Sequence, residues 1–336
     1  MRKWILFWVL FLLVGCSNRP VEVPVLIYDM NDAYMNDFES RLYKLLNHSF
    51  TLKTYNATNS QIIQNEQYDQ LMSSKHSLLL VNPVDRLSVR PLIERANANE
   101  TTIIFFNREP LLVDFELANN AYYVGADAKE SAQIQALLVM ELFGNNPNQL
   151  NDFDKNNDGI IQVVILKGEQ GHQDAEARSY WVVQTLLEAN YQVEVLETKV
   201  ANFDKQTAYE QTLSLFETFD DAIEIIIANN DAMALGAIDA LVDLEIINDV
   251  NMDGIIDQTE EPWLPVVGVD GLEEAILSIK NGYLYGSVNN DSNRMAQIIL
   301  ELTEAILNQY DLNNLSFKIP DNHIIYVNYQ PLTIDY

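Results

Sequence analysis

The sequence is poor in cysteine, in basic residues and, beyond position 20, in long apolar runs. Its single cysteine, Cys16, excludes a framework of intramolecular disulfides. Lysine and arginine together number 20 against 49 aspartates and glutamates, which gives a formal charge of -29. So little positive charge argues against binding to nucleic acid or to another polyanion. The excess of carboxylates instead suits a soluble exported protein and favours hard cations such as Ca²⁺.

The N-terminus carries the apolar run that the rest of the chain lacks. Arg2 and Lys3 precede an apolar stretch over residues 4–14, which fits a signal-peptide core and is too short to span a bilayer. The stretch ends in LVGC, which resembles the lipobox of bacterial lipoproteins. We therefore expect 1–15 to be a signal peptide and 16–22 a tether lipidated at Cys16, holding the protein outside the cytoplasm on a membrane. An ordinary secretion signal with a chance cysteine is the alternative.

Short apolar runs alternate with helical patterns over the remainder of the chain. Nine runs are predicted to be strands: 23–29, 76–82, 101–107, 121–127, 160–168, 191–198, 222–230, 265–271 and 285–291. Most are continuously apolar, which is typical of strands covered on both faces. Two sets of strands separated by helices predict an α/β fold with two doubly wound, Rossmann-like lobes.

Polar residues follow many of the predicted strands. They are Asp29, Asn31, Asp32, Asn107, Arg108, Glu109, Asn229, Asn230, Asp231, Asp270, Asn289, Asn290 and Asp291. Any one of them taken alone is explained as a turn residue or a helix cap. Ligands of open parallel sheets, however, bind beyond the carboxyl ends of the strands. The concentration of these residues in both halves of the chain therefore favours a ligand site.

Several stretches occur in the order found in the bacterial galactose/glucose-binding proteins. They are IIFFNREP (103–110), DKNNDGIIQVVILKGEQGHQDAEAR (154–178), IEIIIANNDAMALGA (223–237), VVGVDGLEEA (266–275) and GSVNND (286–291). The chain thus resembles these periplasmic-type solute-binding proteins of sugar ABC importers. The resemblance implies the type I periplasmic binding protein fold, in which a three-segment hinge joins the lobes. The N-terminal lobe would comprise 23–126 and 290–325, and the C-terminal lobe 127–289 and 326–336.

The same resemblance implies a sugar site in the cleft between the lobes. Its hydrogen-bonding positions would be Asp32, Asn107, His172, Asp174, Arg178, Asn230, Asp270 and Asn290. Such planar groups with defined donors and acceptors suit sugar hydroxyls. Tyr34 and Phe203 would clamp the sugar ring, where the family has phenylalanine and tryptophan. The alternatives are a first-turn acidic residue with a surface ion pair for Asp174 and Arg178, a loop histidine for His172 and ordinary core packing for the two aromatics.

The stretch DKNNDGIIQ follows the order of an EF-hand calcium loop up to its ninth position. Asp154, Asn156, Asp158, the Ile160 carbonyl and Gln162 would be ligands. The twelfth position, normally glutamate, falls on an isoleucine inside a predicted strand, so the loop lacks its bidentate carboxylate. The family resemblance implies that Glu224 supplies it. The alternative is that Glu224 lies at a solvent-exposed strand edge.

A second stretch, DVNMDGIIDQTE (249–260), carries the complete EF-hand pattern. Its expected ligands are Asp249, Asn251, Asp253, the Ile255 carbonyl, Asp257 and Glu260. The alternative is an acidic, solvated loop. We expect one structural Ca²⁺ at the first loop and a second at this one.

The function expected from these features is a binding protein without enzymatic activity. It would capture D-galactose or D-glucose by hinge closure and deliver the sugar, as a monomer, to the membrane permease of an ABC importer. A sugar sensor that presents its closed form to a chemoreceptor or sensor kinase has the same sequence features. A glycosidase with a carboxylate pair is the rival from a different class.

Overall fold

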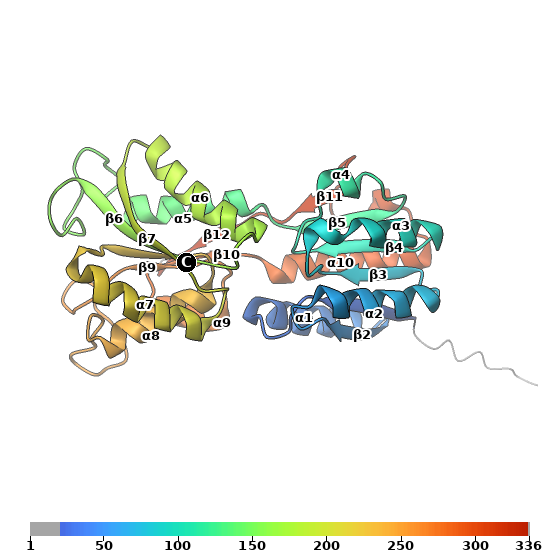
Figure 1. Cartoon of the computed structure of the whole chain (residues 1–336), viewed down its shortest axis with the longest axis horizontal. Coiled ribbons are helices and arrows are strands. Elements are labelled where there is room, and N and C mark those ends of the chain that lie inside the picture. The colour runs from blue at the N-terminus through green and yellow to red at the C-terminus, as the bar shows by residue number, and fades with distance from the viewer. Residues whose placement is uncertain (1–20, 335–336) are drawn as a thin grey trace, which may run out of the picture.

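The computed structural model describes residues 21–334, which form two lobes set end to end (Figure 1). The predicted signal peptide, Cys16 and most of the predicted tether therefore lie outside the described residues, as do the last two residues. Within the described part of the chain, no helix has the length and apolarity that crossing a membrane requires.

The N-terminal lobe is built on a six-stranded parallel sheet with the strand order β11-β5-β4-β3-β1-β2. Helices cover both of its faces (Figure 1). Its elements are β1 (Glu22–Ile27), α1 (Ala33–Leu46), β2 (Thr51–Asn56), α2 (Gln61–Ser73), β3 (Leu78–Val81), η1 (Arg86–Ser88), α3 (Arg90–Ala98), β4 (Thr102–Phe106), α4 (Leu112–Phe115), β5 (Ala121–Gly125), α10 (Ser292–Asn308), η3 (Leu312–Asn314) and β11 (Ile324–Tyr326).

The C-terminal lobe contains a four-stranded parallel sheet with the order β7-β6-β8-β9 and an antiparallel pair, β10-β12. Isolated bridges from Val267 to Gly286 and from Asp270 to Asn289 join the two. Its elements are α5 (Ala128–Leu142), β6 (Ile160–Lys167), α6 (Gln173–Glu188), β7 (Gln192–Val200), α7 (Lys205–Phe219), η2 (Asp220–Ala222), β8 (Ile225–Ala228), α8 (Asp231–Asp243), β9 (Val266–Val267), α9 (Glu273–Lys280), β10 (Ser287–Asn289) and β12 (Gln330–Leu332).

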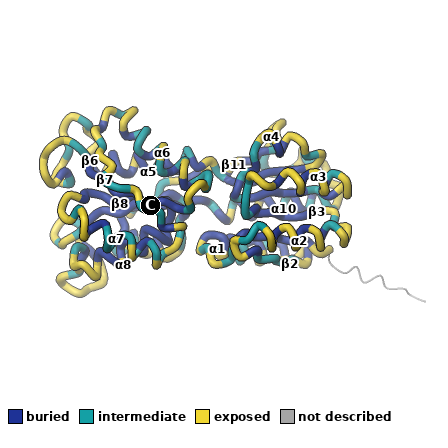
Figure 2. Tube along the Cα trace, viewed as in Figure 1, coloured by how far each residue is buried: buried dark blue, intermediate teal, exposed yellow. Residues whose placement is uncertain are grey.

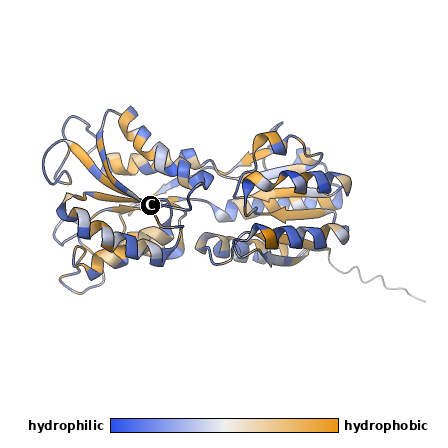
Figure 3. Ribbon diagram, in the orientation of Figure 1, coloured by the Kyte–Doolittle hydropathy of each residue, from blue (hydrophilic) through white to orange (hydrophobic). Residues whose placement is uncertain are grey.

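The central strands form the cores of the lobes because they are apolar on both sides. Every residue of β3 and β8 is buried, and the sheets are both buried and apolar in Figures 2 and 3. Helices bury one stripe each, as α10 does with Met295, Ile299 and Leu302 against the N-terminal sheet. This double covering confirms the predicted α/β class with two doubly wound lobes.

Each of the nine predicted strands coincides with an observed strand, but the sequence patterns missed β2, β11 and β12. β2 is an edge strand whose residues are exposed or half-buried, so it carries no continuous apolar run. β11 and β12 have three residues each, which is too short for a periodic signal.

Three segments connect the lobes. They lie between β5 and α5, between β10 and α10, and between β11 and β12. β11 includes Tyr326, which pairs with Gly125 of the N-terminal sheet, although the predicted boundary assigned this residue to the C-terminal lobe. β1 likewise begins at Glu22, one position before the predicted start of the lobe. The register of the parallel sheet, rather than any local sequence feature, sets these ends.

Candidate functional site

A pocket lies between the two lobes, where loops that follow strands of both sheets meet. Its lining comprises Tyr28, Asp32, Tyr34, Met35, Asn107 and Arg108 of the N-terminal lobe, and His172, Asp174, Arg178, Phe203, Asn230 and Asp270 of the C-terminal lobe. All the residues predicted to contact a ligand are among them except Asn290. Asn290 is adjacent, since its backbone N–H donates to the Asp270 carbonyl at 3.0 Å.

Asp32 both caps helix α1 and lines the pocket. Its side chain caps α1 by accepting a hydrogen bond from the Met35 N–H at 2.8 Å. Its other carboxylate oxygen accepts from the Tyr28 hydroxyl at 2.6 Å. The cap interpretation and the ligand interpretation are therefore compatible, because a carboxylate has about four acceptor positions and these bonds use two.

Arg108 is a pocket residue that was not among the predicted ligand contacts. Its guanidinium carbon lies 3.5 Å from the centre of the Tyr28 ring, a cation–π contact. One terminal nitrogen donates to the Val84 carbonyl at 2.6 Å, and the other reaches Glu169 of the opposite lobe at 3.3 Å. The available signal was its place among the polar residues after a predicted strand.

Arg178 lines the part of the pocket that the C-terminal lobe forms, and three hydrogen bonds hold its guanidinium. Its guanidinium donates to the Asn229 carbonyl at 2.7 Å, to the Tyr329 hydroxyl at 3.1 Å and to Ser131 at 3.3 Å. Asp174 approaches it at 3.4 Å and Asp270 at 4.0 Å. The alternative of a surface ion pair on α6 is therefore wrong, because Arg178 is only 4% exposed. A guanidinium fixed in this way is a preorganised donor for a ligand oxygen.

Burial controls the charges of the pocket. It raises the pKa of Asp174, with Arg178 opposing the shift, and it raises the pKa of Asp270 well above the ordinary value. Burial, followed by the charge of Arg108, lowers the pKa of His172 well below its ordinary value. His172 is therefore neutral near pH 7. Its Nδ1 accepts from the Asp174 N–H at 3.1 Å, which leaves the ring proton on Nε2.

The two predicted aromatics line the pocket from opposite lobes. Tyr34 is 5% exposed, and its hydroxyl finds no hydrogen-bond partner among the residues that the structure describes. Phe203 packs edge-on against the His172 ring, with 5.1 Å between the centroids. A Cβ at Gly168 would overlap the Phe203 ring, so glycine at the end of β6 makes room for it.

Buried hydrogen bonds hold the loop that carries Asp270. The Asp231 carboxylate accepts from the backbone N–H groups of Gly271 and Leu272 at 2.7 and 2.9 Å and from the Ser287 hydroxyl at 2.5 Å. Asp270 itself has a φ of 128°, which costs energy outside glycine. Asp231 therefore holds the loop of Asp270 in place without lining the pocket itself. Its position after a predicted strand did not reveal this role.

The pocket is closed in this arrangement. Its free volume is about 30 Å³, which leaves room for about two water molecules at about 10–15 Å³ each. Glu169 bridges the lobes by accepting hydrogen bonds from Arg108 and, at 3.3 Å, from Asn59. Any larger ligand therefore enters only when the lobes separate.

The first predicted calcium loop closes on a carboxylate that is distant in sequence. Glu224 accepts hydrogen bonds from the backbone N–H of Lys155 at 2.7 Å and of Gln162 at 3.1 Å, one with each oxygen. It is 2% exposed, so the alternative of a solvent-exposed strand edge is wrong. The other expected ligands lie in the loop that leads into β6 or at its start: Asp154, Asn156, Asp158 and the Ile160 backbone.

One atom of this loop is oriented for an absent partner. The Gln162 side chain is 4% exposed, and its Oε1 accepts no hydrogen bond from any described residue. Its amide nitrogen donates to Asp158 at 2.9 Å. A buried amide oxygen without a partner, on a residue that also contacts Asp158 and Glu224, fits an oxygen-seeking cation such as Ca²⁺.

In the second predicted loop, the glutamate that contacts the loop backbone is not the one expected as a ligand. Glu261, not Glu260, folds back and accepts from the backbone N–H groups of Val250 and Asp257, both at 2.9 Å. These are the second and ninth loop positions, the same two that Glu224 engages in the first loop. A helical turn after Asp257 places Glu261 there, because the Asp257 carbonyl accepts from the N–H of Glu261 at 2.9 Å.

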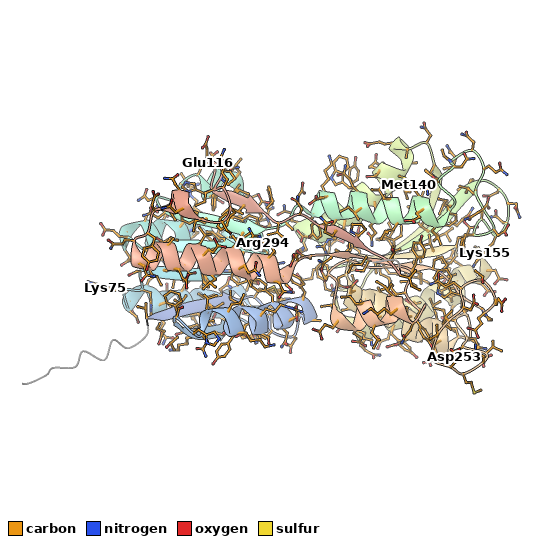
Figure 4. All side chains as sticks on the ribbon, turned by 180° about the vertical axis from the view of Figure 1, so that it is seen from behind. Lys75, Glu116, Met140, Lys155, Asp253 and Arg294 are labelled. Carbon is orange, nitrogen blue, oxygen red and sulfur yellow. The ribbon has the colours of Figure 1, made fainter. Side chains whose placement is uncertain are left out.

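Both loops lie at the end of the C-terminal lobe farthest from the other lobe, as Lys155 and Asp253 show in Figure 4. Over residues 21–334, no group of three or more His, Cys, Asp and Glu side chains could by itself hold a metal ion. The carboxylates of the loops accept backbone hydrogen bonds, as those of Asp154 and Asp249 do. A cation here would depend on amide and carbonyl oxygens as well.

Comparisons with known proteins define the class. Residues 23–311 match the periplasmic binding protein domain family. A galactofuranose-binding protein shares the fold with a TM-score of 0.76 at 15% identity, over 94% of this chain and 95% of that one. A solute-binding protein of Actinobacillus succinogenes with bound D-allose gives 0.75 at 18% identity, over 94% and 98%. The chain belongs to the periplasmic binding protein family, and so it is an extracytoplasmic binding protein and not an enzyme.

Among curated relatives, the chain is similar to the D-galactose/methyl-galactoside binding periplasmic protein MglB of Haemophilus influenzae. The two are 34% identical over 292 residues, which cover 86% of this chain and 81% of that protein. The ribose import binding protein RbsB of Bacillus subtilis is 21% identical over 313 residues, covering 89% and 90%.

Proposed function

We propose that the protein captures D-galactose or D-glucose between its lobes and delivers it to the permease of an ABC importer. Buried polar atoms in the pocket and next to it carry this proposal. The Tyr34 hydroxyl and the Asn290 Oδ1 have no partner among the described residues, and a hydroxyl-rich ligand would satisfy both. The neutral His172 and the paired charges of Arg178, Asp174 and Asp270 favour a ligand without net charge. The similarity to MglB supports a galactose-type hexose.

Titration calorimetry with galactose, glucose, ribose and xylose tests this proposal. We expect both hexoses to bind and the pentoses to bind weakly, because a missing hydroxymethyl group leaves buried polar groups unpaired. Binding of a pentose alone would contradict the hexose assignment, and binding of none of the four would contradict the function.

We propose that Ca²⁺ stabilises the C-terminal lobe at the first loop. Asp154, Asn156, Asp158, the Ile160 carbonyl, Gln162 and Glu224 would hold it. A cation that binds the folded state alone adds about 2.7 kcal/mol at a hundredfold excess over its dissociation constant. We expect a chelator to lower the melting temperature and Ca²⁺ to restore it. If the chelator and Ca²⁺ leave the melting temperature unchanged in both the wild type and Glu224→Ala, the site is contradicted.

We propose a second Ca²⁺ at the loop 249–261, with Glu261 in place of Glu260. Its donor set is otherwise the predicted one: Asp249, Asn251, Asp253, the Ile255 carbonyl and Asp257. The support is the pattern of the loop together with a glutamate that engages the same two loop positions as Glu224 does. Its exposure predicts weaker binding than at the first loop.

We also propose that Cys16 anchors the protein to the membrane by lipidation. The support is the LVGC stretch after an apolar run. Fractionation of cells that express the wild type and Cys16→Ser tests it. We expect the wild type in the membrane fraction and the variant outside it, and equal fractionation would contradict the anchor.

A further inference from the structure

A fully buried asparagine, Asn82, lies behind the part of the pocket that the N-terminal lobe forms. It follows β3 directly, is 0% exposed and does not line the pocket itself. Its backbone N–H donates to the Leu26 carbonyl at 2.8 Å, and its carbonyl accepts from the Gln64 side chain at 3.0 Å. A polar side chain at this depth has to be paired with other polar groups, so its partners determine how its amide is oriented.

Two backbone groups fix the orientation of the Asn82 amide. Its Oδ1 accepts from the Tyr28 N–H at 3.2 Å, and its nitrogen donates to the Phe106 carbonyl at 3.2 Å. A backbone N–H only donates and a backbone carbonyl only accepts. The reversed amide would therefore place donor against donor and acceptor against acceptor. The oxygen and the nitrogen of Asn82 are thus assigned without reference to any ligand.

The second N–H of the Asn82 side chain reaches Asn107, which lines the pocket. It donates to the Oδ1 of Asn107 at 3.1 Å. The Asn107 backbone is held as well, because its N–H donates to the Val124 carbonyl at 3.1 Å and its carbonyl accepts from the Tyr123 hydroxyl at 2.7 Å. Its φ of 59° is a conformation that asparagine adopts more readily than most residues. Both the backbone and the side chain of Asn107 are therefore fixed from behind the pocket.

The hydrogen bond from Asn82 leaves the Asn107 nitrogen as the group available to a ligand. Asn107 is half-buried, and the hydrogen bond of its side chain within the described residues engages its oxygen and not its nitrogen. An amide nitrogen carries two N–H groups and accepts no hydrogen bond. The pocket therefore presents a donor at this position, where an asparagine free to rotate would present either a donor or an acceptor.

We propose that Asn82 is a positioning residue, which sets the specificity of the pocket through Asn107. By holding the Asn107 oxygen, it makes the pocket require a ligand group that accepts a hydrogen bond at this position. The oxygen of a sugar hydroxyl meets this requirement, and fluorine meets it more weakly, whereas hydrogen does not. This inference rests on the proposed capture of a hexose, and it adds what the hexose must supply at one position.

Calorimetry with deoxy and deoxyfluoro analogues of the hexose tests whether Asn107 is a donor. Each hydroxyl of galactose or glucose is replaced in turn, once by hydrogen and once by fluorine, which accepts a hydrogen bond but donates none. The contacted hydroxyl is the one whose removal no longer weakens binding in Asn107→Ala. At that position we expect the wild type to bind the fluoro analogue about two- to tenfold more tightly than the deoxy analogue, which is the range of one hydrogen bond.

Asn82→Ala separates the orientation of the Asn107 amide from its presence. We expect this variant to lose most of the preference for the fluoro analogue, because the amide can then turn either atom towards the ligand. Gln64→Ala is the matched control, since Gln64 is 1% exposed and its hydrogen bond goes to the Asn82 carbonyl, not to the Asn82 side chain. It should lower the melting temperature, as Asn82→Ala does, and keep the preference.

Asn107→Asp is a second variant, which tests the proposal even if Asn82→Ala does not fold. Its carboxylate still offers an oxygen to Asn82 but replaces the amide nitrogen by an acceptor. We expect the preference to be lost or reversed, so that the deoxy analogue binds at least as tightly as the fluoro analogue, because fluorine and a carboxylate oxygen repel each other.

The outcomes distinguish this inference from the proposed function. If hexoses bind but no hydroxyl meets the Asn107→Ala criterion, or if fluorine gives no preference at the contacted position, the positioning role is wrong and the proposed function stands. The same holds if Asn82→Ala or Asn107→Asp keeps the preference. If Gln64→Ala loses it to the same extent as Asn82→Ala, Asn82 acts through the stability of the strand ends, and the positioning role is again wrong. If no hexose binds, both proposals are wrong.

Discussion

Asp270 is a single residue that lowers the stability of the ligand-free protein and contributes to ligand binding. Its carboxylate is 7% exposed, and its backbone has a φ of 128°. Burial raises its pKa well above the ordinary value, although Arg178 lies 4.0 Å away and lowers it. A charged carboxylate in this position costs free energy in the absence of a ligand. Its benefit comes when a ligand hydroxyl donates to it.

We predict that Asp270→Asn weakens hexose binding by at least about 100-fold, or 2.7 kcal/mol, because a charged hydrogen-bond acceptor is lost. The same change should raise the melting temperature of the ligand-free protein at pH 7 by about 2–4 °C per kcal/mol of relieved cost. Calorimetry and thermal unfolding measure the two effects.

The stability gain should depend on pH with a definite sign. Because the pKa of Asp270 is raised on folding, the wild type gains stability as the pH falls from the raised pKa towards the ordinary value of about 3.9. The advantage of Asp270→Asn is therefore complete above the raised pKa and shrinks below it. Glu116→Gln, on the exposed surface of the N-terminal lobe (Figure 4), is the control. An advantage that grows towards acidic pH would contradict the role of burial.

The sequence predicted those pocket residues whose position follows from the neighbouring strand. Asn107, Asn230 and Asp270 follow apolar strands, and so their place at the carboxyl ends of the parallel strands in the two sheets was predictable. Arg108 shares that context, but its function depends on Tyr28 below it and on Glu169 from the other lobe. Those contacts join positions far apart in sequence, and no local pattern encodes them.

At the scale of elements, the end of β6 positions the aromatic wall of the pocket. Gly168 leaves the space that the Phe203 ring fills. We predict that Gly168→Ala displaces this ring and weakens hexose binding about three- to tenfold, because an aromatic contact of about 0.5–1.5 kcal/mol is lost. Calorimetry measures the affinity.

A double-mutant cycle is the control for this displacement. In the Phe203→Ala background no ring remains to be displaced, so Gly168→Ala should change the affinity less than about twofold. Equal effects of Gly168→Ala in the two backgrounds would show that it acts through the strand and not through the ring.

The loop 249–261 offers a matched pair of adjacent glutamates. We predict that Glu261→Ala removes a Ca²⁺-dependent increase in melting temperature, whereas Glu260→Ala retains it. The reason is that Glu261 spans the second and ninth loop positions through its hydrogen bonds. Measurements in the Glu224→Ala background isolate this loop from the first one. Loss of the increase in Glu260→Ala alone would restore the original EF-hand assignment.

At the scale of the whole molecule, few ion pairs hold the lobes together. The Arg108–Glu169 pair is largely enclosed, with side-chain exposures of 6% and 26%. The Arg41–Glu273 pair is longer, at 3.7 Å, and the Glu273 side chain is 88% exposed. Exposed pairs contribute about 0–1 kcal/mol, so Glu169 should dominate closure.

We predict that Glu169→Gln favours the open arrangement and weakens hexose binding about three- to tenfold, mainly through faster dissociation. Stopped-flow kinetics and small-angle scattering of the liganded protein measure the dissociation rate and the closure. Glu273→Gln is the matched control and should leave both unchanged. A larger effect of Glu273→Gln than of Glu169→Gln would contradict this account of closure.

The sequence by itself determined the α/β class, the two lobes and most of the residues that line the pocket. Apolar strands followed by polar residues suffice for the class, the lobes and residues such as Asn107, Asn230 and Asp270, because the period of burial and the ends of parallel strands are local properties. The places of His172, Asp174, Arg178, Tyr34 and Phe203 came from the family resemblance. The tertiary structure alone decided the three short or exposed strands, the contacts of Arg108 and the hydrogen bonds of Glu261 across the loop 249–261. Each of these depends on hydrogen bonds or packing between segments that the chain brings together only when it folds.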